Sequence, residues 1–216
     1  MIQIIPAVLE KDFKSVKEKI NICQGIFKLI QIDIGDGIFV KNKTWQNASD
    51  FKNFNVQMDF EVHLMVKNPR LAVKKWFFKK IKRIIFHLEA DKNPKQILKL
   101  IKQKGFQAGL AVNPGTPLAK LKNIPPDLLD MVLFMGVEPG FSGQNFKKSI
   151  LKKIKSFRKM FPKSKIGVDG GINPKTAPLL KKSGVDYLFV GSYFWKNLKN
   201  YPGQEKKKIK ELLKLF

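Results

Sequence analysis

The sequence predicts an α/β protein built around a parallel sheet, because short apolar segments alternate with lysine-rich segments along its 216 residues. Eight of the apolar segments are rich in β-branched and aromatic residues and have the length of strands. Strands of this kind, separated by helices, are typical of a parallel sheet that is buried on both faces. Because eight such strands close into a barrel, we expect a single-domain (β/α)8 TIM barrel. A doubly wound open sheet is the alternative that the pattern leaves.

The first half of the chain supplies four strand-helix units. Residues 3–9 are an apolar strand, and residues 12–23 have the pattern of a lysine-rich helix whose inner side carries Val16, Ile20 and Ile22. After a second strand at residues 27–34, a long loop leaves room for one short helix at 48–54 before the third strand, 56–65. Pro69 favours the start of a helix over residues 69–80, where its missing N–H costs nothing. The fourth strand, 83–88, precedes a helix over 94–104 that Gly105 ends.

The second half of the chain repeats the same alternation. Strands are expected at residues 106–112, 128–136, 164–168 and 185–190. Helices are expected after Pro117 and at residues 146–160, 174–182, 193–198 and 204–215. No repeat, linker or change in composition divides the chain, so we expect one catalytic domain over residues 1–216.

The composition excludes several classes of protein. A single cysteine, Cys23, excludes an internal disulfide framework and fits a cytoplasmic protein, where it serves as a small apolar filler of the first helix. No apolar run approaches the roughly 20 residues of a membrane span. The first residues also lack the basic and apolar regions of a signal peptide. We therefore expect a cytoplasmic location and no membrane partner.

The net charge of +25 raises the alternative of a nucleic-acid-binding protein. Only Arg70, Arg83 and Arg158 are arginines, so lysines make up nearly all of the 42 basic residues. Base recognition and bidentate phosphate binding favour arginine, and the lysines are spread along every predicted helix. We interpret them as solvated helix faces and expect no specific nucleic-acid partner. Their excess positive charge should still attract anionic phosphate substrates.

Charged and imidazole side chains end three of the predicted strands. Asp33 and Asp169 each close an apolar run, and His63 ends another. Because such groups are costly to bury, their position indicates chemistry at the mouth of a barrel, where the strand ends meet. Together they have the oxygen and nitrogen donors of a metal site. A turn-capping role is the alternative for Asp33, and His87 is either a structural histidine or a partner of the metal site.

Glycine-bearing loops follow three neighbouring strands of the second half, and they indicate a phosphate site. Barrels often bind phosphate with backbone N–H groups of the loops after strands seven and eight. Here those two loops carry Gly170, Gly171 and Gly191, and Ser192 adds a hydroxyl group at the start of a helix. The loop after the sixth strand carries Gly140 and Gly143. The glycines of turns are the alternative interpretation.

Several ordered motifs link these positions. They are D-x-x-D-G-x-F-V-x-N at residues 33–42, H-L-M-V-x-N-P at 63–69, F-H-x-E-A at 86–90, N-P-G-T-P at 113–117, V-x-P-G-F-x-G-Q-x-F at 137–146 and V-D-G-G-I-N at 168–173. With these motifs the chain closely resembles the ribulose-phosphate 3-epimerase family of (β/α)8 barrels, over residues 5–194. The resemblance implies a carbohydrate isomerase that interconverts D-ribulose 5-phosphate and D-xylulose 5-phosphate, a reaction of the pentose phosphate pathway.

The resemblance also implies roles for individual residues. Asp33 and Asp169 are expected as the catalytic base and acid, and one divalent metal ion (Zn, Mn, Fe, Co or Mg) stabilises the enediolate between the two proton transfers. The implied metal ligands are Asp33, His63 and Asp169, with Gln31 at the position of a fourth. The implied substrate and phosphate residues are Ala7, His63, Met65, Met135, Gly140, Phe141, Ser142, Gly143, Gly170, Gly171, Gly191 and Ser192. The expected partner is a phosphorylated ketose, and a homo-oligomer remains open.

The chain departs from the family pattern at several positions. Gln31 stands where the family has a histidine ligand, and Ala7 where it has a serine that contacts substrate. Gly35, Gly136 and Glu138 replace a methionine, a serine and an asparagine. An amide oxygen is a poorer ligand than imidazole, so we expect weaker metal binding and a shift from zinc toward manganese or magnesium. The alternatives are therefore an epimerase with a retuned metal, an epimerase of another ketose phosphate such as a ketohexose 6-phosphate, and a catalytically impaired phosphosugar-binding homologue.

Overall fold

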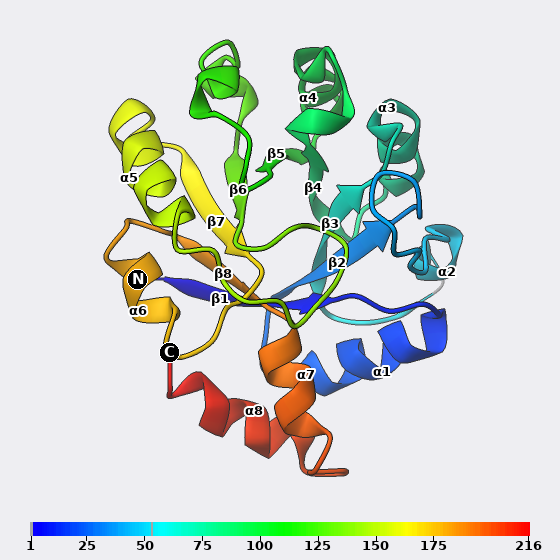
Figure 1. The fold of residues 1–216 in the computed structure, drawn as a ribbon. Coiled ribbons are helices and arrows are strands. Elements are labelled where there is room, and N and C mark those ends of the chain that lie inside the picture. Colours follow the sequence, from blue (N-terminus) through cyan, green and yellow to red (C-terminus); the bar gives the residue numbers. More distant parts are fainter. Residues whose placement is uncertain (1, 53) are drawn as a thin grey trace.

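The computed structural model describes residues 2–52 and 54–216, and its centre is a closed barrel of eight strands (Figure 1). All neighbouring strands are parallel, and the last pairs with the first. The strands are β1 (Gln3–Val8), β2 (Leu29–Gly35), β3 (Asp59–Met65), β4 (Ile81–His87), β5 (Gln107–Val112), β6 (Met131–Met135), β7 (Lys165–Asp169) and β8 (Tyr187–Val190). This strand order confirms the (β/α)8 TIM barrel and excludes the open sheet.

Helices surround the barrel on its outside (Figure 1). They are α1 (Phe13–Cys23), α2 (Ser49–Lys52), α3 (Pro69–Ala72), α4 (Pro94–Gln103), α5 (Ile150–Met160), α6 (Ala177–Lys181), α7 (Ser192–Leu198) and α8 (Glu205–Leu213). Short 3-10 helices lie at Val73–Trp76, Leu88–Ala90, Leu118–Leu121 and Pro126–Leu128. Sequence signals explain the helix starts: Pro69 and Pro94 open α3 and α4, and the Asp12 carboxylate caps α1 by accepting from the Ser15 backbone N–H at 2.8 Å.

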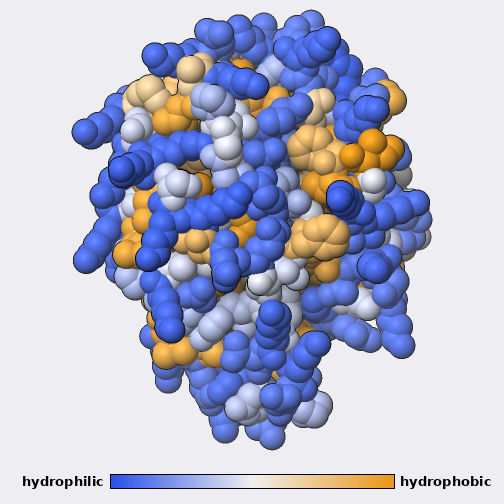
Figure 2. Space-filling view, viewed as in Figure 1, coloured by the Kyte–Doolittle hydropathy of each residue, from blue (hydrophilic) through white to orange (hydrophobic). Residues whose placement is uncertain are grey.

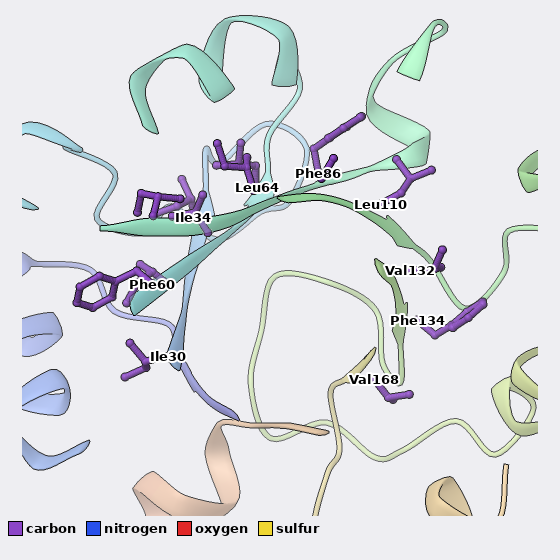
Figure 3. Close-up of a cluster of buried hydrophobic side chains, with 14 of the residues drawn as sticks. Ile30, Ile34, Phe60, Leu64, Phe86, Leu110, Val132, Phe134 and Val168 are labelled. Atoms are coloured by element: carbon purple, nitrogen blue, oxygen red, sulfur yellow. The ribbon is translucent and has the colours of Figure 1, made fainter. Parts of the chain in front are cut away.

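The main hydrophobic core lies between the strands and the helices (Figure 3). Every second residue of a strand points outward into it, and Ile30, Phe60, Phe86 and Phe134 are at most 1% exposed. Burial of each such side chain contributes about 1.5–3 kcal/mol of stability. This layer fixes the register of the strands, because a slip by one residue would turn these side chains into the barrel.

The interior of the barrel holds a smaller apolar cluster and several polar side chains. The buried polar residues include an ion pair, Glu61 with Arg83, whose side chains are 0% and 3% exposed. The Arg83 Nε atom donates to Glu61 Oε2 at 2.9 Å, and its guanidinium group lies over the Tyr187 ring. The two residues are register partners near the starts of β3 and β4, so this pair fills the end of the barrel away from the strand C-termini.

Several helices are shorter than the sequence predicts. The helix expected at 69–80 is α-helical only to Ala72 and continues as a 3-10 turn to Trp76, because β4 begins at Ile81 and the chain must reverse before it. The helix expected from residue 146 begins at Ile150, since residues 136–149 form a loop that crosses the barrel mouth (Figure 1). The helices expected at 48–54 and 174–182 shorten to α2 and α6, and residue 53 lies outside the described residues.

Hydrophilic residues cover most of the face shown in Figure 2, with small apolar patches between them. Most lysines are exposed and distributed over many elements, as the sequence indicates. Across residues 2–52 and 54–216, no helix has the length and apolar character that crossing a bilayer requires.

Candidate active site

Three residues predicted to hold a metal converge at the C-terminal ends of their strands. Asp33 comes from β2, His63 from β3 and Asp169 from β7, and one donor atom of each lies within 4.8 Å of the other two. His63 Nδ1 is 3.0 Å from Asp33 Oδ1 and 3.7 Å from Asp169 Oδ2. Parallel register explains the first contact, because Asp33 and His63 are direct partners on neighbouring strands. Asp169 reaches the same point across the barrel interior from β7, which is not a neighbour of β2 or β3.

Gln31 lies below this triad and bridges its two acids. The Gln31 Nε2 atom donates to Asp33 Oδ1 at 2.9 Å and to Asp169 Oδ2 at 2.7 Å. Its Oε1 atom is buried and has no hydrogen-bond partner among the described residues. The side chain therefore points into the site, as expected for the position of a fourth ligand, but it presents its N–H donors and not its oxygen to the carboxylates.

Burial dominates the electrostatics of the site. It raises the pKa of Asp33 to about 8, helped by the nearby charge of Glu61 and opposed by the hydrogen bond from Gln31. Burial and the charge of Asp33 raise the pKa of Asp169 to about 7. Burial lowers the pKa of His63 to about 4, although Asp169 opposes the change. The triad thus combines two carboxyl groups that hold protons near neutral pH with a neutral imidazole.

The donor set fits a divalent metal ion. Two carboxylates and one imidazole are ligands that zinc, manganese and iron all accept, and a cation would offset the cost of ionising both buried acids. Rotation of the Gln31 amide by a half turn would bring its unpaired Oε1 atom to the side where Nε2 now lies. The amide oxygen would then face the ion, whereas the present N–H donors oppose a cation. The site therefore accommodates a metal with three ligands, and with a fourth only after this rotation.

A cavity of about 270 Å³ opens above the triad. All of the predicted substrate and phosphate residues line it, from Ala7 on β1 to Ser192 at the start of α7. Gln31 is 0% exposed and lies beneath the cavity floor. The loop after β6, residues 136–149, covers one side of the cavity and is tied to β7, since the Gly136 N–H donates to the Asp169 carbonyl at 2.6 Å.

The glycines after β7 also have a packing role, which the sequence analysis did not predict. Gly171 has a positive φ of 70°, and a Cβ atom there would lie 2.8–3.0 Å from the Cβ and backbone atoms of Phe146. A side chain at this position would therefore displace the loop after β6 from the cavity. Gly171 also lines the cavity. It can therefore both allow the loops after β6 and β7 to pack closely and leave its backbone accessible to a ligand.

Some residues of the site were not predicted. Lys196 lines the cavity and its Nζ atom lies 3.1 Å from the point that a Cβ atom of Gly143 would occupy. Its spacing of four residues from Ser192, one turn along α7, was the available signal. Trp195 also lines the cavity and donates from its indole N–H to the Ala7 carbonyl at 2.6 Å.

A second imidazole, that of His87, lies behind His63. Its Nε2 atom faces His63 and its Nδ1 atom faces Glu89. Burial would raise the pKa of Glu89, but the adjacent His87 imidazole and hydrogen bonds from the Thr116 hydroxyl group and the Asn113 N–H lower it to about 2. Burial lowers the pKa of His87 to about 4, opposed by Glu89. Of the two interpretations of His87, this contact favours a partner of the metal site.

Comparison with known proteins agrees with this architecture. Solved tryptophan synthase alpha-subunits of Pyrococcus furiosus share the fold; one has a TM-score of 0.72 and 17% identity, covering 98% of this chain and 97% of that one. Proteins named ribulose-phosphate 3-epimerase are much closer in sequence. That of Methanocaldococcus jannaschii is 40% identical, covering 89% of this chain and 83% of its own length. That of Bacillus subtilis is 35% identical, covering 89% and 91%.

The similarity extends over nearly the whole chain. The protein of Eremothecium gossypii that carries the same name is 33% identical over 202 residues, covering 88% of this chain and 84% of its own length. The sequence model of the Ribulose-phosphate 3 epimerase family matches residues 3–195, which include all of the predicted site residues. The chain belongs to the ribulose-phosphate 3-epimerase family.

Proposed function

We propose that this protein is an isomerase that interconverts D-ribulose 5-phosphate and D-xylulose 5-phosphate. The observation that carries the proposal is the pair Asp33 and Asp169, whose carboxyl groups share one donor on the floor of a cavity rimmed by glycine loops. Inversion of a carbon centre requires a base on one face and an acid on the other. Two carboxyl groups that approach one point from different strands meet this requirement.

In one direction, Asp33 is the base and Asp169 the acid. The Asp33 carboxylate takes the proton from the carbon next to the ketone, the electrons of the broken C–H bond form a C=C bond, and the carbonyl π electrons move to oxygen, giving an enediolate. Protonated Asp169 then delivers its proton to the opposite face. Burial raises the pKa values of both carboxyl groups toward neutral pH, which supports proton exchange by either of them, and the reverse reaction exchanges the roles.

A divalent ion bound by Asp33, His63 and Asp169 would act as a Lewis acid that stabilises negative charge on the substrate oxygens. If the Gln31 amide rotates so that its oxygen becomes a fourth ligand, this donor set favours manganese or magnesium over zinc. Around the reacting carbons, Met65 and Met135 line the cavity with apolar surface, which excludes water from the proton transfers.

We assign the phosphate group to the glycine loops that line the cavity. There the loops after β6, β7 and β8 bring glycines and one serine together: Gly140, Gly143, Gly170, Gly171, Gly191 and Ser192. Phe141 and Ser142 complete this rim, and Lys196 adds a positive charge beside Gly143. Backbone N–H groups and an ammonium group are the donors that a phosphate dianion requires.

We assign this activity to residues 1–216 as one catalytic domain and place it in the cytoplasm, in keeping with the single cysteine of the sequence. The lysine excess supports attraction of an anionic substrate and needs neither a nucleic acid nor a membrane as partner.

The test is proton exchange in heavy water. Protein stripped of metal is incubated with D-ribulose 5-phosphate alone and with each divalent ion in turn, and NMR follows both deuterium at C3 and the appearance of D-xylulose 5-phosphate. We expect both signals to appear together and to increase with metal. Absence of exchange with every ion would refute the proposal, and exchange only on a ketohexose 6-phosphate would assign another substrate.

A further inference from the structure

A buried hydrogen bond between two imidazoles extends the site away from the cavity. His63 Nε2 lies 2.9 Å from His87 Nε2, and the rings stack with centroids 5.0 Å apart. Both side chains are 0% exposed, and they are the only two histidines of the sequence. A contact of this length between two neutral imidazoles requires one proton between the two nitrogens, so one ring donates and the other accepts.

The direction of this bond decides what His63 offers to the triad. If His63 donates from Nε2, its Nδ1 atom carries a lone pair that points at Asp33 and Asp169. If His87 donates instead, His63 carries its proton on Nδ1, which then opposes a cation. A neutral imidazole has one proton, so the two arrangements are exclusive.

Glu89 lies where it selects between the two directions. His87 Nδ1 is 3.4 Å from Glu89 Oε2, and neither atom has a hydrogen bond to another of the described residues. The Glu89 carboxylate can only accept a hydrogen bond, and His87 Nδ1 can donate one only if it carries the proton. Glu89 therefore favours the tautomer of His87 that is protonated on Nδ1. Its Nε2 atom is then an acceptor, and His63 must donate.

The loop after β5 holds Glu89 in place. The other carboxylate oxygen, Oε1, accepts from the Asn113 N–H at 2.9 Å and from the Thr116 hydroxyl group. Lys153 from α5 binds the carbonyl oxygens of Pro114 and Thr116 at 2.5 and 2.6 Å, which fixes this loop. With Oε1 held in this way, Oε2 is directed at His87.

We propose that His87 and Glu89 are positioning residues that hold His63 in its Nε2–H tautomer, so that Nδ1 faces the two acids as a metal ligand. The inference rests on the proposed metal site, but its first test needs neither metal nor turnover. Outer partners of this kind fix the ring and raise its basicity, and their loss typically lowers metal affinity about 10–100-fold.

The tautomers are read directly from long-range ¹H–¹⁵N spectra of the metal-free protein, which contains only these two imidazoles. We expect His63 protonated on Nε2 and His87 on Nδ1. The opposite pattern would overturn the proposal. Because this measurement is independent of catalysis, a protein with the expected tautomers but no exchange on D-ribulose 5-phosphate would refute the proposed function alone.

Two variants, Glu89→Gln and His87→Leu, test the cause, and each has a control variant. Glu89→Gln keeps the shape of the side chain but can donate to His87 Nδ1, so we expect a loss of the single tautomer and a 10–100-fold fall in Mn²⁺ affinity. Glu18→Gln on the exposed face of α1 changes the net charge equally and should leave both unchanged. His87→Leu should lower Mn²⁺ affinity in the same range, and His87→Gln, which retains an acceptor, should restore most of it. Unchanged tautomers and affinity in Glu89→Gln would show that another group orients His63.

Discussion

The amide nitrogen of Gln31 lies 2.7 Å from Oδ2 of Asp169, so a residue of β2 reaches across the barrel to an acid of β7. The same nitrogen also donates to Asp33, and one neutral side chain thereby bridges both proposed proton-transfer groups. Its donors stabilise the two carboxyl groups without a cation. A metal ion bound by the triad would have to compete with these hydrogen bonds, so we expect the residue at position 31 to influence metal affinity.

Replacement of this amide by an imidazole should strengthen the metal site. In Gln31→His, a nitrogen ligand replaces donors that oppose a cation, so we expect higher affinity for metal, with zinc gaining more than manganese. Competition titration of both ions on the parent and the variant measures the difference. Unchanged affinities would show that residue 31 does not reach the ion. Exchange on D-ribulose 5-phosphate, measured alongside, shows whether the stronger site also serves catalysis.

Loss of either acid should abolish epimerisation. Asp33→Asn and Asp169→Asn each preserve shape but remove a group that exchanges the proton, and such groups typically contribute about 10²–10⁴-fold. Since both acids are also metal ligands in our assignment, we expect losses at the upper end or beyond. Asp127→Asn, an exposed acid far from the cavity lining, is the matched control. Activity of Asp33→Asn within tenfold of the parent would assign the base to another residue.

The fold was predictable because its signals are local and repeated. Alternating apolar strands and lysine-rich helices predict the barrel, and each strand of the structure overlaps its predicted range. The errors concern helix ends. Helix α5 begins at Ile150 and not at residue 146, because Phe146 packs against Gly171 of another loop. The sequence pattern of residues 146–160 does not indicate such a contact.

The candidate site was predictable where it lies at strand ends, because parallel register brings those ends together. Asp33, His63 and Asp169 form one cluster for this reason. The orientation of the Gln31 amide depends on two acids 2 and 138 positions away, and the contact of His87 with Glu89 depends on the loop after β5. These two features follow from tertiary packing, and the spacing of residues in the sequence could not predict them.

Removal of a site acid should stabilise the metal-free protein at high pH. The pKa of Asp169 rises from 3.8 to about 7 on folding, so between these values the native state keeps a proton that the unfolded chain has released. Stability therefore falls as pH rises through this window. We expect Asp169→Asn to have a higher Tm than the parent at pH 8, by more than the roughly 2–4 °C that 1 kcal/mol gives in a domain of this size. The difference should vanish below pH 4; an equal difference at both pH values would contradict the linkage.

The buried ion pair of Glu61 and Arg83 should be sensitive to loss of one partner. Arg83→Met leaves Glu61 buried without its counter-ion, which we expect to cost about 3–5 kcal/mol of unfolding free energy. The double variant Glu61→Leu/Arg83→Met removes both charges and should recover most of this loss. Urea unfolding of the parent, the single variant and the double variant measures the coupling. A double variant no more stable than Arg83→Met would show that packing, and not the unpaired charge, causes the loss.

Lys196 should contribute to binding of the substrate and not to the proton transfers. Its ammonium group lies beside Gly143 on the phosphate side of the cavity, and its side chain is exposed, so water and salt screen its charge. We expect Lys196→Met to raise KM for D-ribulose 5-phosphate by up to about tenfold, an energy of about 1.4 kcal/mol, while kcat stays near the parent value. The increase should shrink as salt rises, because the lost interaction is electrostatic.

Lys182→Met, an exposed lysine that does not line the cavity, changes the net charge equally and separates a local contact from long-range attraction. Equal KM values for the two variants would place the phosphate away from Lys196, whereas a fall in kcat would place this lysine at the reacting carbons.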